Sequence, residues 1–207
     1  MASNNGDYRG LLIDYGGVLT TDVFASFSAF CAREGLEPDA VIRVFCDDAE
    51  CRELMIGLET GRVAQEQFEP PVAALLGVQP AGLIDRLFGD TKLDEQMLET
   101  VRLARAGGIR TGLLSNSWGT TRYPRDLLAE LFDAVVISGE VALRKPAPEI
   151  YVLGAEHLGI RPGECVFVDD LSGNLAPAAE LGMATVQHRA TDDTIAQLER
   201  LFGLSLR

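Results

Sequence analysis

Beyond Asp90 the sequence alternates between short apolar runs and longer stretches whose apolar residues recur at helical spacing. Such alternation is typical of parallel β-strands joined by crossover helices, which limits the folds open to the chain. We interpret as strands residues 109–114, 134–137, 165–168 and 184–187. We interpret as helices residues 93–106, 124–132, 148–158, 175–181 and 192–202. The pattern predicts an α/β fold with a doubly wound parallel sheet.

One further apolar run, at residues 11–13, stands near the start of the chain and is followed at once by Asp14. A run of this kind suits a central strand covered on both faces, and Gly16 and Gly17 then allow the backbone to turn sharply. Ligands of open α/β sheets bind at the carboxyl ends of the strands, so Asp14 is placed for chemistry. Taken alone, an acid after an apolar run is more often a turn or cap residue.

The stretch between that first run and the alternating part shows helical spacing only. Breaks divide it into four or five short helices, at residues 35–38, 57–61, 70–71 and 77–80. We therefore expect two domains: an α/β core formed by residues 1–20 and 90–207, and a small all-helical cap at residues 21–89, inserted after the first strand.

The start of this cap carries three phenylalanines at helical spacing, Phe24, Phe27 and Phe30. They could line a ligand site. An aromatic stripe at this spacing is more often part of a hydrophobic core, which is the interpretation that we favour.

Charge and composition exclude several classes of partner. The 18 Lys and Arg residues face 31 Asp and Glu, and the net charge of -13 disfavours binding to nucleic acid or to an anionic membrane surface. No stretch approaches the roughly 20 apolar residues of a membrane span, and the polar first seven residues do not resemble a signal peptide, so we expect a cytoplasmic protein. Four cysteines without a Cys-x-x-Cys motif indicate reduced thiols, and a zinc site at Cys46 and Cys51 is the less favoured alternative.

Polar residues follow the later strands at the points where those strands should end. Ser115 and Asn116 follow the predicted strand at residues 109–114, and Lys145 lies in a loop after the strand at 134–137. Asp169 and Asp170 follow the strand at 165–168. Each alone is more simply a cap, a turn or a solvated charge. Together, at successive strand ends that face one crevice, they favour a functional site.

These residue types suit phosphoryl transfer, which needs a nucleophile, a cation and donors for the phosphoryl oxygens. Asp14 could attack phosphorus, and Asp14 and Asp169 could hold Mg²⁺ through their oxygens. Lys145 could neutralise the nucleophile and the phosphoryl charge, while Ser115 and Asn116 could donate hydrogen bonds.

Four stretches in this order resemble the four motifs of the haloacid dehalogenase superfamily. They are residues 14–19, 113–116, 144–146 and 167–170, and the resemblance extends over nearly the entire chain. The residues around the last three are similar to the branch that contains the phosphatase domain of soluble epoxide hydrolase and bacterial sugar-phosphate phosphatases. The resemblance implies a Rossmann-like core with a helical cap.

Carried over by position, the resemblance also implies roles for single residues. Asp14 would become phosphorylated, and Ser115, Asn116 and Lys145 would act in catalysis and hold the phosphoryl group. The metal would be held by the residues that match the family's ligands: Asp14, Gly16 through its carbonyl, Asp169 and, in support, Asp170. The expected protein is an Mg²⁺-dependent phosphatase that acts on a small phosphorylated metabolite, with sugar phosphates among the candidates. The sequence does not indicate an oligomeric state.

Two positions depart from the family pattern. Gly16 stands where most of its phosphatases carry a second Asp as general acid and base, and Ala142 replaces a glycine common in the loop before the lysine. The first departure leaves an alternative open, a catalytically impaired phosphate-binding or regulatory protein. Metal-independent dehalogenases also lack the second Asp, but their fourth motif is not an acidic pair, so Asp169 and Asp170 make that second alternative less favoured.

Overall fold

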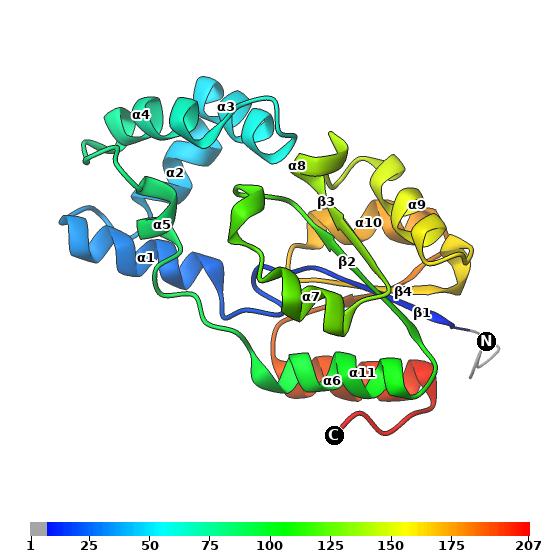
Figure 1. The fold of residues 1–207 in the computed structure, drawn as a ribbon. Helices are drawn as coiled ribbons and strands as arrows, with labels where there is room; N and C mark the ends of the chain where they lie inside the picture. The colour runs from blue at the N-terminus through cyan, green and yellow to red at the C-terminus, as the bar shows by residue number, and fades with distance from the viewer. Residues whose placement is uncertain (1–7) are drawn as a thin grey trace.

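The computed structural model describes residues 8–207, and its centre is a five-stranded parallel sheet in the order β3-β2-β1-β4-β5 (Figure 1). The strands are β1 (Gly10–Ile13), β2 (Arg110–Ser115), β3 (Ala134–Ile137), β4 (Cys165–Asp169) and β5 (Ala184–Gln187). Every pairing is parallel, and the predicted strands lie within a residue of these bounds. The sheet order reverses beside β1, which places a crevice at the carboxyl end of that strand.

Helices cover both faces of the sheet, which confirms the doubly wound α/β fold. One layer holds α6 (Glu95–Ala106), α7 (Arg125–Leu131) and α11 (Thr191–Phe202), and the other holds α9 (Pro148–His157) and α10 (Ser172–Glu180). Leu11 and Ile13 pack into the core on the first side, whereas Leu12 packs into the core on the second. The uninterrupted apolar run in β1 is therefore explained by burial on both faces.

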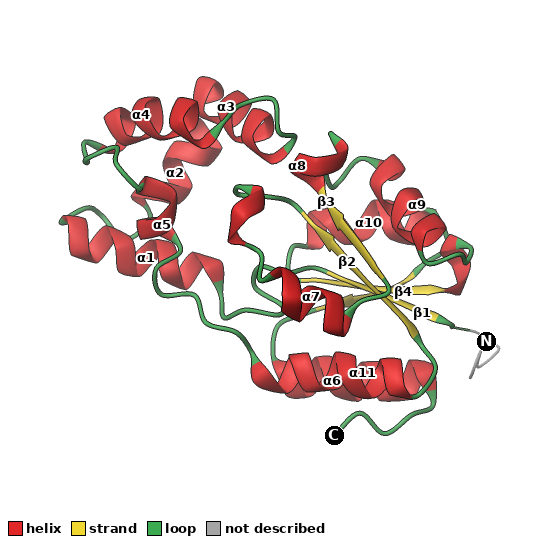
Figure 2. Cartoon of the chain, in the orientation of Figure 1, coloured by secondary structure: helices red, strands yellow, loops and turns green. Residues whose placement is uncertain are grey.

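The regular elements named between β1 and α6 are all helices, as the sequence predicts for this stretch (Figure 2). Its helices are α1 (Val23–Glu34), α2 (Ala40–Asp47), α3 (Ala49–Glu59), α4 (Gln65–Leu76) and α5 (Leu83–Leu87). They share a hydrophobic core of their own. The division into domains at residues 21 and 89 stays a prediction, and residues 1–7 of the first segment lie outside the described residues.

One predicted break in this helical stretch is wrong. Helix α4 continues through Pro70 and Pro71, although each proline removes a helical hydrogen bond. Phe68, Val72 and Leu76 lie on the buried side of α4, and tertiary burial of this kind overrides local propensity. A break that the prolines did not predict occurs instead at Asp48, whose carboxylate accepts a hydrogen bond from the Cys51 backbone and caps α3.

Two chain segments connect the helical part to the sheet and run side by side. Thr20 and Leu93 form an isolated antiparallel bridge. Around it, the Thr21 amide donates to the Lys92 carbonyl at 2.8 Å, and the Asp94 amide donates to the Leu19 carbonyl at 2.9 Å. Because both crossings are joined by hydrogen bonds, the helical part is attached to the core through one paired connection.

The helical part also rests on the core at a second place. Arg144 lies beside Lys145 in the loop after α8 (Ser138–Val141), and its guanidinium forms an ion pair with Glu59 at the end of α3. The Ser138 hydroxyl donates to the Glu59 carbonyl. Glu59 is buried, and that burial raises its pKa although the Arg144 charge opposes the shift.

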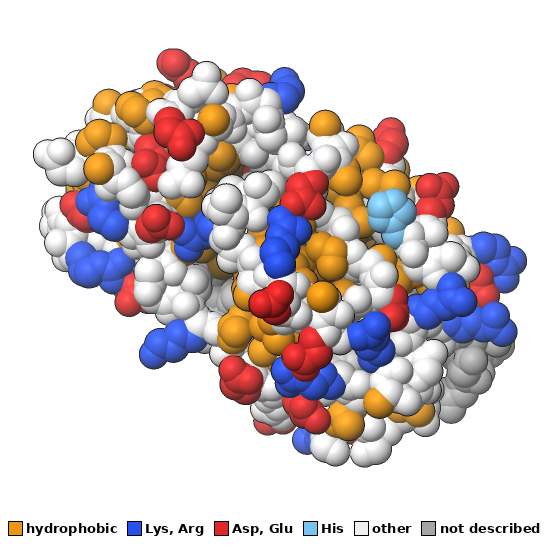
Figure 3. Space-filling view, in the orientation of Figure 1, with side chains coloured by type: hydrophobic (Ala, Val, Ile, Leu, Met, Phe, Trp, Pro, Cys, Tyr) orange, Lys and Arg blue, Asp and Glu red, His pale blue; other side chains and the backbone are white. Residues whose placement is uncertain are grey.

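The cysteines, the surface charge and the lengths of the helices bear on which ligands or surfaces the protein could bind. The four cysteines are free thiols. On the face drawn in Figure 3, acidic side chains lie among the basic ones. No helix within residues 8–207 has the length and apolar character needed to cross a membrane.

Candidate active site

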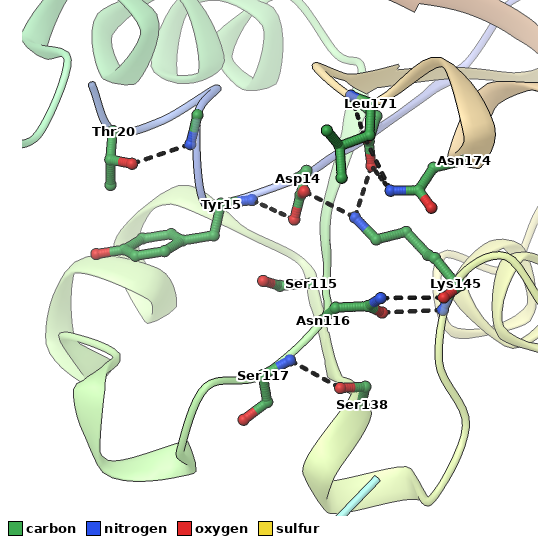
Figure 4. A network of polar contacts seen from close by, with 12 residues as sticks. Asp14, Tyr15, Thr20, Ser115, Asn116, Ser117, Ser138, Lys145, Leu171 and Asn174 are labelled. Carbon is green, nitrogen blue, oxygen red and sulfur yellow. Dashed lines mark hydrogen bonds and ion pairs between the residues drawn. The ribbon is translucent and has the colours of Figure 1, made fainter. Parts of the chain in front are cut away.

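The predicted site residues from three neighbouring strands meet at one edge of the sheet. Asp14 follows β1, Ser115 ends β2 and Asp169 ends β4, and these strands are adjacent in the sheet. In the register of the sheet, Ile13 lies opposite Leu113 on one side and Val168 on the other. Asp14 and Asp169 follow directly on paired residues, and Ser115 comes one position further along β2, so all three lie at the same end of the sheet. Figure 4 shows Asp14 and Ser115 close together there.

Lys145 lies at the centre of this arrangement and is fully buried. Its Nζ is 2.9 Å from Asp14 Oδ2 and 2.7 Å from Asp169 Oδ2. Burial disfavours the ammonium form, but the two carboxylates outweigh that effect and raise the pKa of Lys145. The side chain is thus held as a cation that joins the ends of β1 and β4.

Asn116 fixes the loop that carries this lysine. Its Nδ2 donates to the Lys145 carbonyl at 3.0 Å, and its Oδ1 accepts from the Lys145 amide at 2.9 Å. Both bonds appear in Figure 4. The sequence predicts contact between Asn116 and a phosphoryl group, but it does not predict this clamp, because the partners are backbone groups 29 residues away.

Ser115 has a partner that sequence reasoning did not single out. The Ser115 hydroxyl and the Tyr123 hydroxyl are 2.9 Å apart, and either can donate. The Tyr123 ring also packs on Tyr15, with 5.1 Å between the centroids. Tyr123 lies in an irregular stretch after β2, where no periodic pattern marks it as a site residue. Its hydroxyl orients the predicted phosphate donor.

Asp169 is fully buried and held by groups from the next turn of the chain. Asn174 Nδ2 donates to both of its carboxylate oxygens, at 3.0 and 3.1 Å, and the Leu171 amide donates to Oδ1 at 2.9 Å. Asn174 belongs to α10, which begins at Ser172, three residues before the predicted start. This earlier start brings Asn174 to the end of β4.

Asp14, Asp169 and Asp170 form a group that could hold a metal ion, with one ligand atom from each within 4.8 Å of the others. Within residues 8–207 no other set of three or more His, Cys, Asp or Glu is grouped in this way. Burial raises the pKa of Asp14 to about 7 and that of Asp170 to about 6. Burial makes Asp14 and Asp170 costly to ionise, so with Asp169 beside them they fit a hard divalent cation, because such an ion favours the charged form of a carboxylate.

Of Gly16 and Gly17, which follow Asp14 in the turn after β1, only Gly17 lies where the backbone requires glycine. Gly17 has φ of +72°, and a Cβ there would lie 2.6 Å from Asp170 Oδ2, so only glycine fits. Gly16 has no such constraint: a Cβ there would meet only Val23 Cγ2, at 3.3 Å. The sharp turn therefore depends on Gly17, and the departure at Gly16 is not imposed by the fold.

Ala142, the second departure, has an energetic consequence. It is the one non-glycine residue in the described chain with positive φ, at 56°, which an alanine side chain disfavours. We expect Ala142→Gly to raise the free energy of unfolding by about 1 kcal/mol, since glycine adopts this conformation without the Cβ clash. Chemical denaturation of both proteins measures the difference, and an unchanged or lower stability would contradict it.

A cavity of about 490 Å³ opens beside these residues, between the sheet edge and the helical part. Asp14, Gly16, Ser115, Asn116 and Asp170 line one end of it. The helical part supplies mainly apolar side chains to the rest, among them Phe24, Phe27, Phe45 and Phe88. Phe30 is fully buried in the core of the helical part, as predicted for the stripe, and Phe27 belongs to that core and also lines the cavity. Phe24 departs from the prediction, because it is exposed and lines the cavity.

Comparison with known proteins places the chain in a family. The model of the haloacid dehalogenase-like hydrolases matches residues 8–182. Bifunctional epoxide hydrolase 2 of Sus scrofa is 33% identical over 131 residues, which cover 60% of this chain and 24% of that protein. The glyceraldehyde 3-phosphate phosphatase of Methanopyrus kandleri is 28% identical over 123 residues, 58% of this chain and 53% of the other.

A crystal structure agrees at the level of the fold. An HAD family enzyme from Bacteroides thetaiotaomicron, in complex with magnesium and inorganic phosphate, superposes with a TM-score of 0.65 at 24% identity, over 88% of this chain and 95% of the other. The matched segment spans only about a quarter of the epoxide hydrolase. With its parallel sheet, its cluster of acids at the strand ends and a family match over most of its length, the chain belongs to the haloacid dehalogenase-like hydrolases.

Proposed function

We propose that this hydrolase is an Mg²⁺-dependent phosphatase of small phosphorylated metabolites. The observation that carries the proposal is the buried Lys145 between Asp14 and Asp169, with Asp170 beside them at the cavity. The arrangement combines a carboxylate nucleophile, a fixed cation and a ligand set for a metal. The phosphatase named among the relatives and the magnesium and phosphate bound by the related enzyme support the same chemistry.

In the proposed reaction, a carboxylate oxygen of Asp14 attacks phosphorus while the bond between phosphorus and the ester oxygen breaks. The ester oxygen leaves with its electron pair and takes a proton from water, and a second water then cleaves the aspartyl-phosphate, which releases phosphate and a proton and restores Asp14. Lys145 holds Asp14 in place, and Ser115, oriented by Tyr123, donates to a phosphoryl oxygen. Asp14, Asp169, Asp170 and the Gly16 carbonyl would hold Mg²⁺, which supplies positive charge for the phosphoryl oxygens.

The two alternatives predict different behaviour. A metal-independent dehalogenase would have no use for three carboxylates grouped around one point, so the acidic cluster favours the phosphatase. A phosphate-binding protein without turnover would keep the cluster and the lysine. Only activity measurements separate that alternative from the proposal.

A panel of phosphate monoesters, assayed with Mg²⁺ and with excess chelator, tests the proposal. We expect hydrolysis of at least one ester class with Mg²⁺ and a loss of at least about 100-fold in chelator, because the clustered acids would then lack a counter-charge. Turnover that is unchanged in chelator would rule out the metal-dependent mechanism. Phosphate binding without any hydrolysis across the panel would instead support the regulatory alternative.

The glycine at position 16 leads to a prediction about which esters react fastest and about the rate of hydrolysis of the aspartyl-phosphate. No acid at this position can protonate the departing oxygen, so esters with good leaving groups, such as aryl or anomeric phosphates, should react faster than phosphates of primary alcohols. The same absence slows attack of water on the aspartyl-phosphate. With an aryl phosphate, rapid-quench measurements should therefore show a burst of the phenol before steady turnover.

The variant Gly16→Asp tests this directly. Its side chain needs only a small shift of Val23, because the added Cβ lies 3.3 Å from Val23 Cγ2. We expect a smaller burst and a narrower gap between aryl and primary phosphates. Gly16→Ala is the matched control, since it adds the Cβ without the carboxylate. Equal rates for both ester classes in the native protein, with no burst, would show that another group already supplies the proton.

A further inference from the structure

We propose that the cavity beside Asp14 selects phosphate esters with an apolar alkyl or aryl group, in preference to the hydroxyl-rich esters of sugars. This inference rests on the proposed phosphatase function and specifies the substrate class. The sequence places sugar phosphates among the candidate substrates, and this proposal predicts that they are hydrolysed less efficiently than apolar esters.

The first support is the exposure of large hydrophobic residues. Within residues 8–207 three are exposed: Phe24 at 40%, Leu75 at 47% and Leu171 at 43%. Two of them, Phe24 from α1 and Leu171 from the loop after β4, line the cavity. Exposed apolar side chains that gather at a concave site mark a binding surface, because covering them removes apolar area from water.

The second support is the wall behind them. Trp118 lines the cavity and packs with Phe27, Phe45 and Phe88, at centroid distances of 5.9, 5.2 and 5.3 Å. Phe27 and Phe45 are themselves nearly buried, at 4% and 7% exposed. The rings therefore support one another in fixed positions, and the apolar surface exists before any ligand arrives.

The third support is that both arginines in the cavity wall already have acidic partners. Arg144 pairs with Glu59, and Arg122 pairs with Asp85 while its guanidinium lies 5.0 Å from the centroid of the Phe88 ring. A sugar that entered the part of the cavity formed by the rings would lose water from its hydroxyls and would meet aromatic faces there. An alkyl or aryl group loses no hydrogen bonds on entering.

The position and size of the cavity complete the argument. Asp14, Ser115 and Asp170 line the same cavity as Phe24 and Trp118, so one molecule can place its phosphate at the acids and its organic group among the rings. A volume of about 490 Å³ falls within the range of roughly 300–1,000 Å³ found for sites that bind small organic ligands.

A series of n-alkyl phosphates tests the proposal, because butyl, pentyl and hexyl phosphate share nearly the same leaving group and differ only in apolar length. We expect kcat/KM with Mg²⁺ to rise by about two- to fourfold for each added methylene. Hexyl phosphate should exceed glucose 6-phosphate, which is also a primary ester. A flat series, or faster hydrolysis of glucose 6-phosphate than of hexyl phosphate, would overturn the proposal.

Two variants link the preference to the cavity wall. Phe24→Gln should flatten the chain-length dependence, since it replaces an apolar wall residue by an amide. Leu75→Gln is the matched control: Leu75 is similarly exposed in the helical part but does not line the cavity, and its variant should keep the native slope. Equal slopes in both variants and the native protein would refute the assignment to this wall.

Binding measurements separate failure of this inference from failure of the proposed function. Hexylphosphonate and methylphosphonate, which cannot be hydrolysed at their P–C bond, are titrated into the native protein with Mg²⁺ by calorimetry. Tighter binding of hexylphosphonate supports the apolar site even if no ester is turned over. Equal affinities alongside rapid ester hydrolysis would leave the phosphatase function standing and refute the apolar preference.

Discussion

Replacing Asp14 by Asn is expected to lower kcat by at least about 10,000-fold, because it removes the carboxylate oxygen that forms the covalent bond to phosphorus. The amide has nearly the same shape, so the fold should persist. Phosphate release assays measure the loss. Native protein quenched in acid during turnover of a ³²P-labelled ester should carry label, and the Asp14→Asn protein should not.

Asp22 provides the matched control for this substitution. Its carboxylate, eight residues after Asp14, is a candidate for the missing proton donor, but in the structure it accepts from the Phe24 and Ala25 amides and caps α1. It also does not line the cavity. Because Asn caps helices as well as Asp, Asp22→Asn should keep activity within about threefold. A large loss of activity in Asp22→Asn would assign Asp22 to proton transfer. Native activity in Asp14→Asn would refute the covalent mechanism.

Replacing Lys145 by Met is expected to lower the free energy of unfolding by about 3–5 kcal/mol in chelator, since it leaves two buried carboxylates without their counter-charge. Asp14 and Asp169 lie 2.9 and 2.7 Å from the ammonium that the substitution removes. Denaturant unfolding with and without Mg²⁺ measures the effect. Added Mg²⁺ should stabilise the variant more than it stabilises the native protein, because the cation then supplies the missing charge.

Lys92 is the other lysine of the chain and gives a direct comparison. It is exposed at the cavity rim, so Lys92→Met should change stability by no more than about 0.5 kcal/mol. A Lys145→Met protein as stable as the Lys92→Met protein in chelator would mean that the two carboxylates are protonated rather than paired. Equal Mg²⁺ effects in variant and native protein would argue against a cation beside Asp14.

Much of this arrangement follows from the sequence because parallel strands bring their carboxyl ends to one edge. The apolar run before Asp14 and the run before Asp169 predict one strand each. These two strands pair directly in the sheet, which places the two acids together. Helix continuity across Pro70 and Pro71 could not be predicted, since it depends on burial that only the tertiary fold creates.

The contacts that position the site residues were also beyond the sequence. The clamp between Asn116 and the Lys145 backbone joins groups 29 residues apart, and the hydroxyl contact of Tyr123 with Ser115 comes from an irregular stretch. Neither leaves a periodic signal. The aromatic stripe was misjudged in part for a similar reason, because helical spacing identifies the buried side of α1 but not whether Phe24 faces solvent or a cavity.

The place of Trp118 has an optical consequence. It is the single tryptophan of the chain, it belongs to the segment after β2, and it is enclosed by phenylalanines of the helical part. An indole between these two parts emits at a wavelength set by how much water reaches it. The intrinsic fluorescence of the unlabelled protein therefore reports, in real time, how closely the helices sit over the sheet edge and when a ligand fills the space beside Asp14.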